Sequence, residues 1–251
     1  MRRFFTEQIK SENGLCIISG AEARHISRVL RMTRGDRLVL LNGDGDRYET
    51  EIESAGAREI LVRIIRPLPS PPASQIDITL CQSLLKSRPM DYLIQKTSEL
   101  GVKKILPFIS ERTVVRPDIR KSDNKLRHWK EIAQNSTKQA GRLVPAEIGP
   151  VSPIQEIMIQ WKDKEAQKII LWEDENARDL KNVLRNRAPS GSFAGIIGPE
   201  GGFTKTEVET AKDSGFIPVS LGQRILRAET AAVTLLAIIQ YEWGDLSLPG
   251  D

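Results

Sequence analysis

Strand-like and helix-like segments alternate along the chain from residue 76 to residue 243. The strand-like runs are short and apolar, and they lie at residues 76–80, 105–108, 168–172, 193–197 and 216–221. The helix-like runs are longer, and they lie at residues 89–100, 124–139, 177–187, 204–214 and 228–243. This alternation predicts an α/β domain in which parallel strands form a sheet with helices on both faces.

The last two strand-like runs are each followed by a glycine-containing turn and then by a helix. The first turn is residues 198–204, GPEGGFT, and the second opens residues 221–231, LGQRILRAETA. Gly201 and Gly202 allow a tight turn and a close approach of a ligand, because glycine has no Cβ. In an open α/β sheet, ligands bind at the carboxyl ends of the strands. The sequence therefore predicts a ligand site at these two turns.

Other local signals narrow the kind of site. No Gly-Lys-Ser/Thr follows the glycines and GxGxxG is missing, so neither a P-loop nor a dinucleotide fold is expected. Thr204 and Glu207 have the spacing of a capping box, which starts a helix directly after the glycines. The chain has only two cysteines and two histidines, far apart in the sequence, so we expect no disulfide framework and no metal site.

Three charged residues of the second turn stand among apolar neighbours. Arg224, Arg227 and Glu229 fall at the end of a strand-like run. Charges in such surroundings are either paired with one another, as Arg227–Glu229 or Arg224–Glu200, or turned toward a polar ligand. Two turns that close on one cleft favour the ligand.

A proline-rich segment divides the chain. Residues 67–72 contain four prolines, which neither a helix interior nor a central strand accommodates. We expect one domain at residues 1–70 and a second at residues 74–251. The first has β-type runs at residues 14–18, 37–41, 47–52 and 60–65, with a hairpin turn, NGDG, between the middle two. This pattern is typical of a small β-barrel-like domain.

One helix is expected in the first domain, at residues 21–32. Helical spacing places Ile26, Val29 and Leu30 on one face. The same spacing places Arg24, Arg28 and Arg31 together on another face. These arginines are either a solvated helix surface or contacts to nucleic-acid phosphates, together with Arg2 and Arg3 near the N-terminus.

The charge is distributed unevenly along the chain. Residues 86–145 hold 14 basic and 6 acidic residues, whereas the whole chain has a net charge of only +4. Such a block suits a polyanion such as RNA, or it is a solvated helical surface balanced by the more acidic C-terminal part. No apolar run reaches the ~20 residues that span a bilayer. The charged start, MRRFFTEQ, is unlike an export signal, so we expect a cytoplasmic protein.

Several segments together resemble a known family. The residues that carry the resemblance are GPEGGF at 198–203, LGQRILRAETA at 221–231, HISRVLRM at 25–32 with GD at 35–36, QKTSELGV at 95–102, SER at 110–112 and QAGR at 139–142. They are similar to the motifs of the RsmE family, the 16S ribosomal RNA uridine-N3 methyltransferases of the SPOUT superfamily. Ala140 departs from the Cys or Ser of that pattern.

The resemblance implies a fold, a cosubstrate and partners. The first domain would be a PUA-like RNA-binding β-barrel. The second would be a SPOUT methyltransferase domain with a C-terminal trefoil knot. The enzyme would methylate N3 of a specific uridine in 16S ribosomal RNA, and the RNA would be bound as part of the small ribosomal subunit. It would use S-adenosylmethionine without a metal and act as a homodimer. The apolar run 228–243 would be buried in or near the interface.

The resemblance also implies site residues. Those for the cosubstrate are Leu171, Trp172, Glu173, Gly198, Pro199, Glu200, Gly201, Gly202, Leu221, Gly222, Arg224, Ile225, Leu226, Arg227, Thr230 and Ala231. Those for catalysis are Arg142, Glu200, Arg227 and Glu229. Those for RNA are Arg2, Arg3, Arg24, Arg28, Arg31, Lys86, Arg88, Arg112, Arg116 and Arg142.

Three other functions stay open at this point. One is a non-catalytic RNA-binding protein that keeps the knotted fold. Another is a related SPOUT methyltransferase that acts on transfer RNA or on a ribose 2′-hydroxyl. A nucleotide- or phosphate-binding metabolic enzyme would account for the glycines but not for the basic block.

Overall fold

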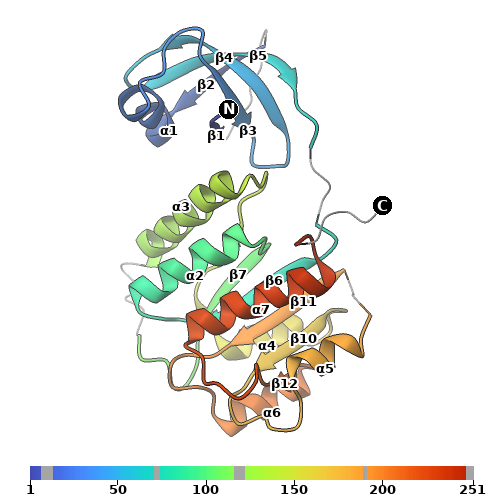
Figure 1. The fold of residues 1–251 in the computed structure, drawn as a ribbon. Coiled ribbons are helices and arrows are strands. Elements are labelled where there is room, and N and C mark those ends of the chain that lie inside the picture. Colours follow the sequence, from blue (N-terminus) through green and yellow to red (C-terminus); the bar gives the residue numbers. More distant parts are fainter. Residues whose placement is uncertain (7–13, 71–73, 116–121, 189–190, 247–251) are drawn as a thin grey trace. The chain divides into compact units, whose positions relative to one another are not determined.

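The computed structural model describes residues 1–6, 14–70, 74–115, 122–188 and 191–246. These residues form two compact units (Figure 1). Unit 1 comprises Met1–Ala73 and Thr137–Pro145, and unit 2 comprises Ser74–Ser136 and Ala146–Asp251. Unit 1 therefore includes a segment, 137–145, from beyond the proline-rich stretch.

Unit 1 is built on a curled five-stranded sheet (Figure 1). In order across the sheet its strands are β1 (Arg3–Phe5), β3 (Arg37–Leu41), β4 (Arg47–Ala55), β5 (Glu59–Pro67) and β2 (Leu15–Ser19). β1 runs parallel to β3, and the other neighbours are antiparallel. The four strands expected from the sequence are present. In the turn after β3, the Asn42 side-chain oxygen accepts hydrogen bonds from the backbone of Asp44 and Asp46.

The helix of unit 1 ends earlier than expected. An α-helical turn, α1 (Gly20–Arg24), continues into a π-helical turn, η1 (His25–Val29), in which Leu30 N donates to His25 O at 3.0 Å. The wider turn rotates Val29 into solvent, where it is 70% exposed, so its expected place on the apolar face is wrong. Arg31 lies past the helix with φ of 51°, so it does not continue a helical row with Arg24 and Arg28.

A carboxylate of β4 is buried between two arginines. Glu49 is 4% exposed, and its side-chain oxygens accept hydrogen bonds from Arg66 at 2.8 Å and Arg37 at 3.2 Å. The hydrogen bond from Arg66 is the main cause of a pKa of Glu49 below its usual range, and it outweighs the opposite effect of burial. A hydrogen bond from Arg63 lowers the pKa of Glu53 in the same way.

Unit 2 contains the parallel sheet that the alternation predicts. Across the sheet the strands follow the order β12 (Ile217–Val219), β10 (Gln167–Leu171), β11 (Ser192–Ile197), β6 (Asp77–Ser83), β7 (Lys104–Ile109) and β8 (Glu147–Ile148). The short β9 (Ser152–Pro153) pairs with the end of β7. All of these pairings are parallel.

Helices cover both faces of this sheet, as predicted. One face packs against α2 (Ser87–Glu99), α3 (Ser122–Ala140), α5 (Leu180–Arg185) and α7 (Ala228–Trp243), and the other against α4 (Ile154–Trp161) and α6 (Lys205–Asp213). Along β11 the side chains alternate between the two cores. Phe193 and Ile197 enter the first core, whereas Ala194 and Ile196 enter the second. Periodicity of two along each strand therefore builds a three-layer domain.

The last helix is not buried all round in the isolated chain. Leu235, Leu236 and Ile239 of α7 are fully buried against the sheet. On the opposite side Tyr241 is 71% exposed, so the expected burial holds for one face only. Within the described residues, no helix is long and apolar enough to cross a membrane.

Candidate functional site

Unit 2 has a cavity at the carboxyl ends of three adjacent strands. β12, β10 and β11 are neighbours in the sheet, and the segments that follow them surround a volume of about 500 Å³. Its lining residues are Pro89, Leu171, Trp172, Glu173, Ile197, Gly198, Pro199, Glu200, Gly202, Phe203, Val219, Ser220, Leu221, Gly222, Gln223, Arg224, Ile225, Leu226, Arg227, Ala228, Glu229 and Ala231. The two late turns thus meet in one pocket, as the sequence predicts.

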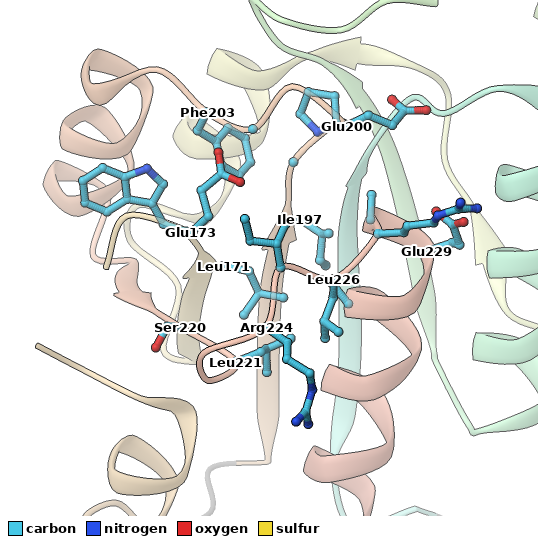
Figure 2. A pocket seen from close by; sticks show the side chains of 18 of the residues that line it. Leu171, Glu173, Ile197, Glu200, Phe203, Ser220, Leu221, Arg224, Leu226 and Glu229 are labelled. Atoms are coloured by element: carbon cyan, nitrogen blue, oxygen red, sulfur yellow. The ribbon is translucent and has the colours of Figure 1, made fainter. Parts of the chain in front are cut away.

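The pocket combines an apolar interior with charged edges. Figure 2 shows Leu171, Ile197 and Leu226 gathered in its middle, with Glu173 and Glu229 on opposite sides. This is the usual composition of a small-molecule site, in which apolar walls provide contact area and a few polar groups fix orientation.

The charged residues of the pocket are not paired with one another. Arg224 and Arg227 are exposed, and within the described part of the chain neither an Arg227–Glu229 nor an Arg224–Glu200 ion pair is formed. The structural alternative considered for these residues is therefore wrong. Their charges are accessible to a ligand.

The two glycines of the first turn are needed for different reasons, a positive φ at Gly202 and a close approach of another loop at Gly201. Gly202 has φ of 67°, and a Cβ there would lie 2.5 Å from Glu173 Oε1. Gly201 lies against another loop, where a Cβ would be 3.3 Å from Arg112 Cβ. The Gly202 amide closes the turn by donating to Pro199 O at 3.0 Å. A side chain at position 202 would both strain the backbone and displace a pocket carboxylate.

The two helices that start at the pocket differ at their N-termini. α6 has the predicted capping box, in which Thr204 and Glu207 bond reciprocally. α7 begins at Ala228, and the side chain of its N-cap residue, Arg227, makes no capping hydrogen bond. The first-turn N–H groups of α7, at Ala228 and Glu229, therefore stay available at the wall of the pocket. Such a helix start favours a negatively charged ligand group.

Most of the predicted cosubstrate residues line the pocket, and only Gly201 and Thr230 of that set do not. Seven lining residues were not named individually from the sequence: Pro89, Ile197, Phe203, Val219, Ser220, Gln223 and Ala228. Phe203, Gln223 and Ala228 fall inside the two predicted turns, 198–204 and 221–231. Ile197, Val219 and Ser220 lie one or two residues before those turns. Pro89 comes from the first turn of α2, and no sequence signal links it to the turns.

The predicted catalytic residues fall into two groups. Glu200, Arg227 and Glu229 line the pocket. Arg142 belongs to unit 1 and is not a lining residue.

The predicted RNA-binding residues lie on both units. Arg2, Arg3, Arg24, Arg28 and Arg31 are exposed on unit 1. Lys86, Arg88 and Arg112 are exposed on unit 2. Arg88 directly precedes the pocket residue Pro89, and Lys86 lies three residues before it. Arg116 lies outside the described residues.

The described ranges hold neither a cluster of metal ligands nor an exposed cysteine. They contain no group of three or more His, Cys, Asp or Glu residues placed to hold a metal ion. Cys16 and Cys81 are both free and buried. Burial raises the pKa of Cys81 to about 12, which keeps its thiol protonated and inert.

Known proteins resemble this chain over nearly its full length. A family model described as "RNA methyltransferase domain" matches residues 72–240, and one described as "RNA methyltransferase PUA domain" matches residues 18–65. A protein of Bacillus subtilis named ribosomal RNA small subunit methyltransferase E is 29% identical, with 96% of this chain and 97% of the relative covered.

Two solved structures are similar in fold as well as sequence. A ribosomal RNA small subunit methyltransferase E from Neisseria gonorrhoeae, bound to S-adenosylmethionine, is 32% identical with a TM-score of 0.88 over 98% of this chain and 100% of that one. A methyltransferase from Legionella pneumophila, also with bound S-adenosylmethionine, is 34% identical with the same TM-score over 97% and 98% of the two chains.

Proposed function

The chain belongs to the family of ribosomal RNA small subunit methyltransferases E, and we propose that it methylates N3 of one uridine in 16S ribosomal RNA. Family membership makes the protein an enzyme that transfers a methyl group from S-adenosylmethionine to ribosomal RNA. The choice of the uridine and of its N3 atom is the proposal.

The pocket of unit 2 is the main structural support for this function. Three segments line it, residues 171–173, 198–203 and 219–231, and they follow three neighbouring strands. The same segments resemble the loops that hold the methyl donor in the family. The sequence motifs and the fold thus indicate the same pocket.

The residues of this pocket fit the methyl donor. The volume of about 500 Å³ lies in the usual range of small-molecule sites. Leu171, Ile197 and Leu226 suit the flat adenine ring, and the open start of α7 suits the carboxylate of the methionine part. Glu173 and Glu229 can accept hydrogen bonds from hydroxyl or ammonium groups. When bound, the compound supplies an electrophilic methyl group on a sulfonium.

The target atom imposes two chemical requirements. N3 of uridine lies on the Watson–Crick edge, so the base must be unpaired when it enters the site. N3 also carries a proton, which must leave before or during attack. Either a carboxylate accepts this proton, or cations stabilise the negative charge that develops on O2 and O4.

The pocket offers groups for both roles. Glu200 and Glu229 are its candidates for the proton acceptor, and Arg227 is its candidate for charge stabilisation. Arg142 of unit 1 is proposed for the same charge from the motif resemblance alone. Alignment of the reacting atoms is a further contribution, since positioning by itself removes a large part of the barrier.

RNA binding is proposed for exposed cations of each unit. Arg88 directly precedes the pocket residue Pro89 and Lys86 lies three residues before it, so both are available to phosphates that flank the target base. The exposed arginines of unit 1 provide sequence-independent contacts of the same kind. The assembled small subunit is the proposed form of the substrate.

Four further features belong to the proposal. They are a homodimer that uses the exposed face of α7, a trefoil knot around the pocket segments, a cytoplasmic location and domain bounds at residues 70 and 74. The partly apolar outer face of α7 supports the dimer. An enzyme that modifies ribosomal RNA works where ribosomes assemble, which supports the location.

A methyl-transfer assay tests the function. The purified protein is incubated with labelled S-adenosylmethionine and either naked 16S RNA or assembled small subunits, and the modified nucleotide is mapped by mass spectrometry. The proposal expects one 3-methyluridine, with the label on the base. A methyl group on a ribose or on another RNA would contradict it, and no binding of the methyl donor would favour a non-catalytic RNA-binding protein.

A further inference from the structure

The first pocket turn is attached to a loop from a different part of the sheet. Residues 110–113 follow β7, whereas residues 198–204 follow β11. Arg112 Nη1 donates to Gly201 O at 3.1 Å. The backbones approach so closely that a Cβ on Gly201 would lie 3.3 Å from Arg112 Cβ. Arg112 therefore touches the residue that precedes the pocket residue Gly202.

A buried carboxylate makes a second connection between the same loops. Glu207 is 7% exposed, and its Oε2 accepts from Thr204 N at 2.9 Å in the capping box. Its other oxygen, Oε1, accepts from Glu111 N at 2.9 Å. A capping box requires only the first of these bonds. The second bond joins residues 96 positions apart, and both are charge-assisted.

The loop after β7 is itself firmly anchored. The Thr113 hydroxyl accepts from Ser110 N at 2.8 Å and lies 3.0 Å from the Ser110 hydroxyl. It also lies 2.9 Å from the hydroxyl of Ser83, the last residue of β6. All three side chains are buried. The first pocket turn is thus tied to a rigid support rather than held by its own turn geometry alone.

We propose that Glu207 and Arg112 are positioning residues that hold the turn 198–204 in the conformation that binds the methyl donor. The identity of that ligand rests on the proposed function. Arg112 was expected from the sequence to contact RNA phosphates, and its hydrogen bond to Gly201 assigns it a different role. Neither residue lines the pocket, so each acts through the turn.

Hydrogen–deuterium exchange of the free protein tests the connection without any ligand. Glu207→Gln keeps the side-chain size but replaces one acceptor oxygen with a donor that neither Glu111 N nor Thr204 N can use. Glu209→Gln, on the exposed side of the same helix, is the matched control. We expect exchange in residues 199–207 to become about tenfold faster in Glu207→Gln and to stay unchanged in Glu209→Gln. Equal exchange in both variants would overturn the proposal.

Binding measurements separate positioning from RNA contact. We expect Arg112→Ala to weaken binding of S-adenosylmethionine about fivefold by calorimetry without RNA. We expect Arg112→Lys to restore much of the affinity, because a single N–H donor is used. Lys205→Ala, which removes an exposed neighbouring charge, should change nothing.

The binding measurements distinguish a positioning role of Arg112 from a contact with RNA phosphates. If Arg112→Ala weakened RNA binding and left the methyl donor unaffected, Arg112 would be a phosphate ligand and the proposal would be wrong. If the wild-type protein did not bind S-adenosylmethionine at all, the proposed function would fail. The exchange experiment would still decide whether Glu207 holds the turn.

Discussion

Replacement of Gly202 by alanine tests the geometry of the pocket turn. The new methyl group would meet two separate obstacles. A φ of 67° costs a non-glycine residue about 1–2 kcal/mol. The Cβ would also lie 2.5 Å from Glu173 Oε1, a distance at which the carboxylate must move. We therefore expect the free energy of unfolding to fall by about 2 kcal/mol, and S-adenosylmethionine to bind at least tenfold more weakly.

Three other variants separate backbone strain from steric conflict with the Glu173 side chain. Gly222 has φ of 98°, but nothing lies within 4 Å of the position of its Cβ, so Gly222→Ala measures backbone strain alone. Glu173→Ala removes the side chain that a Cβ at position 202 would meet. The double variant Gly202→Ala/Glu173→Ala should therefore be destabilised relative to Glu173→Ala by about as much as Gly222→Ala is relative to the wild type.

Urea denaturation gives the free energies, and calorimetry gives the affinities. If Gly202→Ala unfolded within about 0.5 kcal/mol of the wild type and bound the methyl donor equally well, the reasoning about this turn would be wrong.

Three other predictions concern separate parts of the molecule. Arg227→Ala should lose methyl transfer while its thermal unfolding stays close to that of the wild type, because Arg227 is exposed at the pocket; wild-type turnover would remove Arg227 from the mechanism. Thr204→Ala should lower the free energy of unfolding by about 1 kcal/mol in urea denaturation, since it removes the side-chain cap of α6. The lowered pKa values of Glu49 and Glu53 contribute stability that is complete above their unfolded value of about 4.3 and is lost as the pH falls through their folded values. Unit 1 should thus unfold more easily below about pH 4.3, and Glu49→Gln should weaken this dependence in pH-jump denaturation.

The regular part of the fold could be predicted because its patterns are long. The alternation after residue 76 gave the parallel sheet and its two helical layers, and the run 228–243 coincides with α7 (Ala228–Trp243). Short elements lack such a pattern. β1 (Arg3–Phe5) has three residues, and β8 and β9 have two each, so only pairing with a neighbouring strand defines them. α4 (Ile154–Trp161) was not predicted, and its eight residues span little more than two turns.

Two local features depend on three-dimensional context. The π-turn at His25–Val29 shifts every following side chain around the helix axis, and no residue in it distinguishes it from a regular helix. This shift is why Val29 is exposed and why Arg31 leaves the predicted row.

The candidate site was predictable where one segment supplies it and not where distant segments meet. The turns after β11 and β12 were found from their glycines and flanking strands. The bond between Glu111 and Glu207, and the approach of Pro89 to the pocket, depend on the packing of separate strands and helices. The predicted roles of Arg142 and of the exposed arginines of unit 1 stay predictions.

A crystal structure of the protein with S-adenosylmethionine is the most direct test of the central claim. We expect the compound to lie in the pocket of unit 2, in contact with residues 171–173, the turn 198–203 and the first residues of α7. Density for the compound at any other place, or its absence at saturating concentration, would contradict the account.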